Sequence, residues 1–249
     1  MDHGFDLLMV TSTLIFLLAG FVKGVIGLGL PTVAIGLLGL VMTPAKAASL
    51  LVVPSLVTNI WQLVAGPGFA PLVRRFWTLL TGFCVGTWMG AGWVGGDAGG
   101  SATTLLGVAL IAYALLGLSK KRFMVSAQAE RRLSPVIGIA TGMIAAATGV
   151  FVIPAVPYLN ALALERDELV QVLGLSFTVS TIALGIVLMN HGIFQLSVAG
   201  ASSLALLPAL AGMFAGQRVR MRVRPETFRT CFFVGILLLG AHLSLRHLF

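Results

Sequence analysis

The chain alternates long apolar stretches with short clusters of charged residues. Six stretches are long enough to cross a bilayer as helices, since about 20 apolar residues span the hydrocarbon core. They cover residues 45–65, 77–95, 102–118, 169–189, 194–215 and 227–245. They lack the strict apolar–polar alternation of transmembrane β-barrel strands. The pattern therefore predicts an all-α integral membrane protein.

Two further pairs of apolar segments are short. They are residues 7–22 with 32–41, and residues 134–149 with 150–164. The stretch from Gly20 to Pro31 interrupts the first pair with four glycines and the proline, which are poor residues for a continuous helix. A weaker copy, from Gly138 to Gly149, follows 118 residues later. Broken segments in corresponding positions of two halves point to the substrate site of a secondary transporter.

The basic residues predict the topology. Positive loops stay in the cytoplasm, and the lysines and arginines concentrate in three places: Arg74 with Arg75, the five between Lys120 and Arg132, and Arg218 to Arg224. All three loops are cytoplasmic if each short pair enters the membrane and returns to the same side. Each half is then a broken, re-entrant helix pair plus three transmembrane helices. The two halves, residues 1–118 and 134–249, are inverted repeats joined by a cytoplasmic basic linker at 119–133.

Composition narrows the classes of function. Of the 249 residues, 58% are hydrophobic and 10% charged, against about 25% charged in soluble domains. The net charge of +8 arises in the loops, so we expect a lipid bilayer and not nucleic acid as partner. Isolated Cys84 and Cys231, and the lack of Walker A and His-Glu-x-x-His sequences, predict no cofactor, no metal site and no enzymatic activity. The acidic start of the chain predicts no cleaved signal peptide.

Lys23 lies in the middle of the first broken segment. A lysine at membrane depth faces water, a partner or the substrate, or else extends to the membrane surface. Helix N-termini at the breaks would add partial positive charge that suits an anion. We therefore predict an anion site around the broken segments, with these candidates: Lys23, Gly24, Gly27, Gly29, Gly142, Thr148 and Gly149.

Small polar residues on two corresponding spans are further candidates. At an offset of 122, Asn59 matches Thr181 and Thr58 matches Ser180. Their alternative role is hydrogen bonding between helices. The set is Ser55, Thr58, Asn59 and Gln62 on one span and Ser176, Thr178, Ser180 and Thr181 on the other; Trp61 and Tyr158 could hold an apolar or aromatic part of the substrate.

The eight acidic residues all lie at span ends or in loops. A carboxylate proton carrier inside the membrane is therefore not predicted. A coupled proton would travel on a weak-acid substrate or through His191, and a cation is the other candidate coupling ion.

A family resemblance rests on these same motifs. Gly20-x-x-x-Gly24-x-x-Gly27-x-Gly29, the helix start at Pro44-Ala45-Lys46-Ala47, and their repeats near 138–149 and 166–168 resemble the sulfite exporter TauE/SafE family over almost the whole chain. The resemblance implies a bacterial inner-membrane carrier of sulfur-containing anions such as sulfite, sulfoacetate or aromatic sulfonates. Ala145 and Ala147 stand where the first copy has glycines, which predicts unequal roles for the two halves.

These observations together predict a secondary transporter of small sulfur-containing anions. Its two inverted halves would rock around an anion site at the membrane midplane, in an alternating-access cycle. The alternatives are a passive anion channel, a carrier for non-sulfur organic anions, and a membrane protein that binds without transport.

Overall fold

The computed structural model describes residues 2–66, 68–94, 100–119, 124–220, 222 and 225–246, and the side chains of the first helix from Met9 onward. Across these residues the chain forms helices and loops without a strand. The helices are α1 (Asp2–Ile26), α2 (Leu30–Leu38), α3 (Pro44–Val64), α4 (Phe69–Met89), the 3₁₀-helix η1 (Gly90–Trp93), α5 (Ser101–Leu118), α6 (Ala127–Thr148), α7 (Ala155–Asn160), α8 (Arg166–Asn190), α9 (Leu196–Arg220) and α10 (Pro225–Leu245). Some predicted loop residues, Lys120, Lys121, Arg122 and Arg224, lie outside the described residues.

Six helices within the described ranges are long and apolar enough to cross a membrane: α1, α3, α5, α8, α9 and α10. This confirms the predicted all-α membrane class. The set differs from the predicted one at a single place, because it contains α1 and not α4. Helix α4 begins at Phe69 and includes Arg74 and Arg75 in its first turns, which lowers its hydropathy, whereas the predicted span began at residue 77.

The first helices of both broken pairs are longer than predicted. Helix α1 has 25 residues and α6 has 22, which corresponds to about 37 and 33 Å, against about 24 Å for the predicted 16 residues. Directly after these two helices the backbone has positive φ, at Gly27 and Gly29 with 85° and 102° and at Gly149 with 75°. Positive φ favours glycine, so these three residues mark the true breaks.

The glycines upstream of the breaks stay helical because they pack closely against another helix. Gly20 and Gly24 of α1 face α9, and a Cβ atom on Gly24 would lie 2.2 Å from the Met213 carbonyl oxygen. Gly138 and Gly142 of α6 face α4 in the same way. Small residues allow close backbone approach between membrane helices. Gly24 and Gly142, which the family resemblance places among the breaks, therefore lie within continuous helices.

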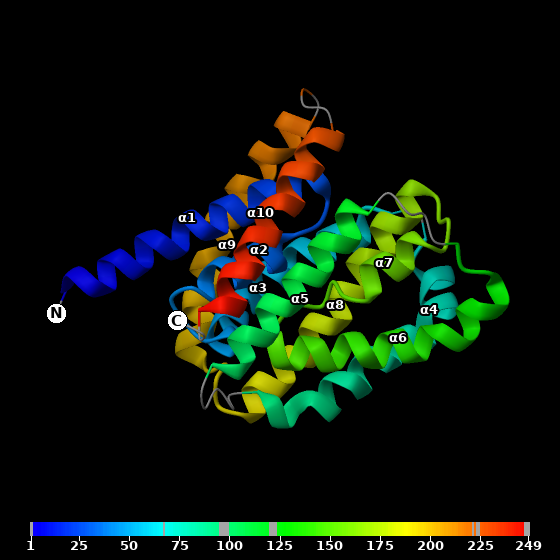
Figure 1. The fold of residues 1–249 in the computed structure, drawn as a ribbon, viewed down its shortest axis with the longest axis horizontal. Coiled ribbons are helices and arrows are strands. Elements are labelled where there is room, and N and C mark those ends of the chain that lie inside the picture. The colour runs from blue at the N-terminus through cyan, green and yellow to red at the C-terminus, as the bar shows by residue number, and fades with distance from the viewer. Residues whose placement is uncertain are drawn as a thin grey trace.

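Helices in corresponding positions of the two halves pack in opposite directions. Gly174 of α8 lies against Asn59 of α3, and Gly185 lies against Val52, so residue numbers rise along one helix as they fall along the other. Helices α5 and α10 are antiparallel in the same manner. The first helix of each half packs instead on the fourth helix of the other half, α1 on α9 and α6 on α4 (Figure 1). Inverted repeats would produce this reciprocal arrangement.

The region predicted as a linker contains the start of a helix. Helix α6 starts at Ala127, inside the predicted linker 119–133, and the Ser126 side chain accepts a hydrogen bond from the Ala129 amide at 3.3 Å. Serine is a preferred N-cap residue, so the helix start has a local cause.

Candidate functional site

Lys23 lies one turn before the end of α1 and is buried, with 5% of its surface exposed. Its Nζ atom donates to Thr58 Oγ1 at 3.1 Å and to Asn59 Oδ1, both on α3. The side chain therefore reaches across to another helix and does not extend to the membrane surface. Of the two roles predicted for Lys23, the structure supports the inward-facing one.

One face of α3 carries the polar partners of Lys23. Ser55, Thr58, Asn59 and Gln62 are all buried there, since residues three and four apart are neighbours on a helix. Thr58 Oγ1 donates to the Pro54 carbonyl oxygen at 2.7 Å, which orients a lone pair for the lysine. Gln62 does not share in this cluster, because its Nε2 donates to the Val170 carbonyl oxygen of α8 at 3.0 Å.

Two polar atoms on this face have no hydrogen-bond partner among the described residues. They are Ser55 Oγ and Asn59 Nδ2, on residues that are at most 1% exposed. Buried polar atoms are almost always paired, so such exceptions call for an explanation such as a ligand. Both groups can donate, as can Lys23 Nζ. Three donors from two helices thus lie within about one helical turn, an arrangement that suits an anion.

A small pocket of about 10 Å³ lies between α3 and α8. Ser55 and Thr181 give it polar atoms, and Ile35 and Gly149 bring one residue from each broken pair to its wall. A volume of this size holds a single water molecule. An anion of the size of sulfite does not fit this pocket unless the lining residues move.

The second half contributes less to this cluster than the first. Ser176 and Ser180 lie on the side of α8 away from Gly174, which faces α3. Their hydroxyls are buried and lack a partner among the residues described. Thr148 Oγ1 donates to the Ile144 carbonyl oxygen at 2.7 Å and accepts from the Val150 amide at 3.1 Å. It therefore stabilises the end of α6.

Two predicted aromatic site residues lie elsewhere. Trp61 is 63% exposed. It follows Asn59 by two residues, and residues two apart on a helix point to different sides. An exposed tryptophan near a span end is typical of the membrane interface. Tyr158 is buried against α6, where its hydroxyl is 2.7 Å from Ser134 Oγ. The prediction that both hold the substrate is not supported by these positions.

The glycines predicted for the site fall into two groups. Gly24 and Gly142 pack against helix backbones and present no groups to a ligand. Gly27 and Gly29 form the turn after Lys23, with open space at Gly27 and the Phe232 ring beside Gly29.

The Lys23–Asn59 contact is displaced from the predicted midplane. Asn59 is five residues before the end of α3 at Val64, about 8 Å along the helix axis. Ser55 and the pocket it lines lie near the middle of the same helix. The lysine site is therefore closer to the end of α3 that leads to Arg74 and Arg75.

Ser202 of α9 is a structural residue that the sequence patterns do not single out. Pro54 lacks an N–H, so the Leu50 carbonyl has no partner within α3. Ser202 Oγ donates to that carbonyl oxygen at 2.8 Å and accepts from the Val53 amide at 3.1 Å. Backbone groups inside a membrane need hydrogen-bond partners from the protein. A proline inside a span therefore predicts that a side chain of another helix bonds to the backbone groups it leaves free.

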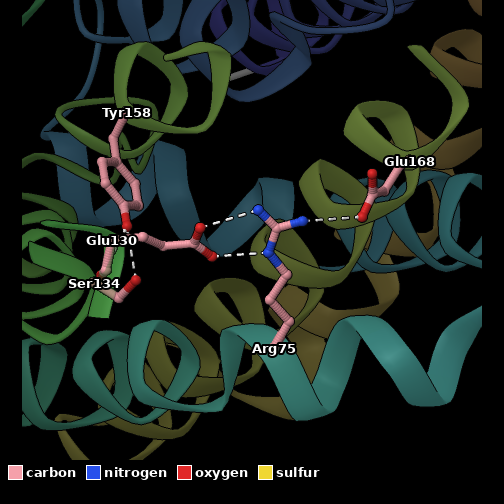
Figure 2. Close-up of polar contacts among 5 residues, drawn as sticks. All are labelled: Arg75, Glu130, Ser134, Tyr158 and Glu168. Carbon is pink, nitrogen blue, oxygen red and sulfur yellow. Dashed lines mark hydrogen bonds and ion pairs between the residues drawn. The ribbon is translucent and has the colours of Figure 1, made fainter. Parts of the chain in front are cut away.

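An ion-pair network joins the N-terminal parts of α4, α6 and α8 (Figure 2). Arg75 Nε and Nη2 donate to the two carboxylate oxygens of Glu130 at 2.8 and 3.0 Å, and Nη1 lies 3.4 Å from Glu168 Oε1. The hydrogen bond with Glu130 raises the pKa of Arg75. The network was not predicted, since the three residues are far apart in sequence. It places Arg75 and the loop before α6 at the same end of the molecule.

Replacing Arg75 by glutamine is expected to destabilise the protein by about 1 kcal/mol, because a bidentate pair is lost but Arg75 is 39% exposed to solvent screening. Thermal unfolding in detergent measures the change. Arg74→Gln is the matched control, since Arg74 is exposed and makes no ion pair among the described residues. An equal effect of both substitutions would contradict a stabilising role for the network.

The fold and the site together indicate the class of protein. A multi-pass membrane protein with a buried lysine that bonds from one helix to another has the features of a membrane transporter. The model of the sulfite exporter TauE/SafE family matches residues 12–243, and the chain belongs to this family of transporters for sulfite and related sulfur anions. Comparison with curated proteins and with solved structures gave no match.

Proposed function

We propose that the protein is a secondary transporter of small sulfur-containing anions in the bacterial inner membrane. The observation that carries this proposal is the buried Lys23. Its Nζ contacts only the neutral acceptors Thr58 and Asn59, and no carboxylate lies within ion-pair distance in the described part of the chain. An anionic substrate would balance the lysine charge.

The chemistry of the neighbouring groups supports a sulfite or sulfonate ligand. Such an anion presents several oxygen acceptors around one sulfur atom, and Lys23 Nζ, Asn59 Nδ2 and Ser55 Oγ are donors. Leu51 and Leu184 line the adjoining pocket and would contact an organic tail if movement of the helices widened this pocket. Sulfite, sulfoacetate and aromatic sulfonates are therefore the proposed substrates.

A carrier that alternates its access accounts for the position of this site. The lysine site lies toward one end of α3, and the pocket between α3 and α8 has room for a single water molecule. An anion at Lys23 can cross only if helices of the two halves move relative to each other. A passive channel would need a continuous open path, and the small volume of this pocket favours a carrier with alternating access instead.

Flux through proteoliposomes tests the proposal. Labelled sulfite, sulfoacetate and benzenesulfonate should each be tested, with acetate as a non-sulfur anion. Saturable flux and counterflow are expected for at least one sulfur anion. A conductance far above carrier turnover would establish the channel instead, and absence of flux for every sulfur anion with folded protein would reject the substrate class.

Asn59→Ala is expected to reduce this flux by about tenfold, because one hydrogen bond to a charged ligand contributes about 1.5 kcal/mol or more. The initial rate of labelled benzenesulfonate uptake measures the change. Asn190→Ala is the control, since Asn190 is exposed at the end of α8. Equal rates for both variants would place the anion elsewhere.

A further inference from the structure

We infer that Lys23 is the proton carrier of the transport cycle: it takes up a proton together with the anion and returns without the anion as a neutral amine. This inference rests on the proposed function and adds the coupling ion to it. Lys23 would then both bind the anion and carry the coupled proton.

The hydrogen bonds of Lys23 support the neutral form in the anion-free protein. A neutral amine has two N–H bonds, and Nζ has two acceptors, Thr58 Oγ1 and Asn59 Oδ1. An ammonium group has a third N–H bond. This third donor would have no protein partner among the described residues, in a side chain that is 5% exposed. An oxygen of a bound anion would supply the missing acceptor and the compensating charge.

The charged groups on the surrounding helices do not replace that anion. Helix α2 has no titratable residue, and α3 has only Lys46, at its opposite end. The titratable residues described on the other two helices packed against α1 are Arg218 and Arg220 on α9, and Glu226, Arg229, Cys231 and His242 on α10. Within the described residues none of these forms an ion pair with Lys23. An ammonium group at this position would therefore be uncompensated, which is costly at membrane depth.

The other proton carriers considered from the sequence are less suitable. The described acidic residues lie at helix ends or in loops, and His191 is exposed at the C-terminal end of α8. Lys23 is a titratable side chain that also contacts the proposed anion site. Uptake of the proton and of the anion can thus depend on each other.

The cycle balances charge at each step. A proton from the aqueous side binds the lone pair of Nζ, and the new N–H bond donates to the arriving anion. Ammonium and monovalent anion then cross as a neutral pair. On the other side the anion leaves, the proton returns to water, and the neutral amine is restored with its bonds to Thr58 and Asn59. One proton therefore moves with each monovalent anion.

Benzenesulfonate is a suitable probe because it stays ionised and cannot carry the proton itself. Wild-type protein in liposomes containing a pH-sensitive dye should acidify the lumen as benzenesulfonate enters, with one proton for each anion. At equilibrium, a tenfold inward proton gradient should accumulate the probe about tenfold, and a membrane potential should leave this ratio unchanged.

Lys23→Arg tests the assignment to this residue. A guanidinium keeps its proton in proteins, so the accumulation ratio should fall to about one and any remaining exchange should be independent of pH. Lys46→Arg is the matched control, because Lys46 is exposed at the start of α3; it should retain the tenfold ratio.

The outcomes separate the two proposals. Wild-type protein that exchanges benzenesulfonate without moving protons, or Lys23→Arg protein that still couples to them, would overturn the proton-carrier role and leave the transport function intact. Folded wild-type protein that exchanges no sulfur anion would instead refute the proposed function.

Discussion

Lys23→Met protein is expected to transport sulfur anions about 100-fold more slowly than the wild type. Methionine has a similar length but neither charge nor donor, and the loss of a charged hydrogen bond to the anion corresponds to about 3 kcal/mol. The substitution also removes a side chain whose charged form has no counter-ion among the described residues at this buried position. Its thermal stability should therefore equal or exceed that of the wild type, because replacing buried charged groups by apolar ones is often stabilising.

The combination of lost flux and retained stability distinguishes a transport residue from a structural one. Initial rates in proteoliposomes and unfolding temperatures in detergent give the two values. Lys46→Met controls for the loss of a lysine, since Lys46 is exposed. Unchanged flux in Lys23→Met, or a large loss of stability without a specific loss of flux, would remove Lys23 from the substrate site.

Gly24→Leu is expected to prevent the native contact between α1 and α9. Its Cβ atom would lie 2.2 Å from the Met213 carbonyl oxygen and 3.0 Å from the Gly216 Cα atom, so the two backbones must separate. We expect destabilisation by more than about 3 kcal/mol, above the usual range for overpacking, because backbone and not a flexible side chain is in the way. The fraction of monodisperse protein after detergent extraction measures this loss.

Gly200→Leu is the control on α9, where a Cβ atom would have no neighbour within 4 Å. This variant should remain folded, with a change of less than about 0.5 kcal/mol. If Gly24→Leu were as stable as this control, the close packing of α1 on α9 would be wrong.

The hydrophobic pattern was sufficient to predict the class of fold, and it also located most of the helices. The glycine motifs were harder to interpret, because the same residue type permits a sharp turn and a close helix contact. At Gly27, Gly29 and Gly149 the chain turns, whereas at Gly24 and Gly142 a neighbouring backbone requires the small residue. The sequence does not show which neighbour is present, so the end of the first helix was placed at residue 22, before its observed end at Ile26.

The structure brings together Lys23 and Asn59, two of the predicted site residues, whereas other candidates lie elsewhere. A buried lysine needs partners, which made the polar face of α3 a sound candidate. Whether Trp61 points inward depends on helix rotation, and whether Gln62 binds a ligand or the Val170 carbonyl depends on the packing of α8. The Arg75–Glu130–Glu168 network depends on three distant segments. None of these segments contains a motif that predicts the network.

The exchange of packing partners between the halves has a consequence for biosynthesis. Gly20 of α1 packs on Ala209, so its partner helix is made 189 residues later in the chain. At about 5–20 residues per second, the ribosome needs about 10–40 s to synthesise that interval. Helix α6, in contrast, meets α4 when that helix has already been made. Helix α1 thus leaves the ribosome well before α9, and during that delay its glycine face is open to lipid or to a membrane chaperone.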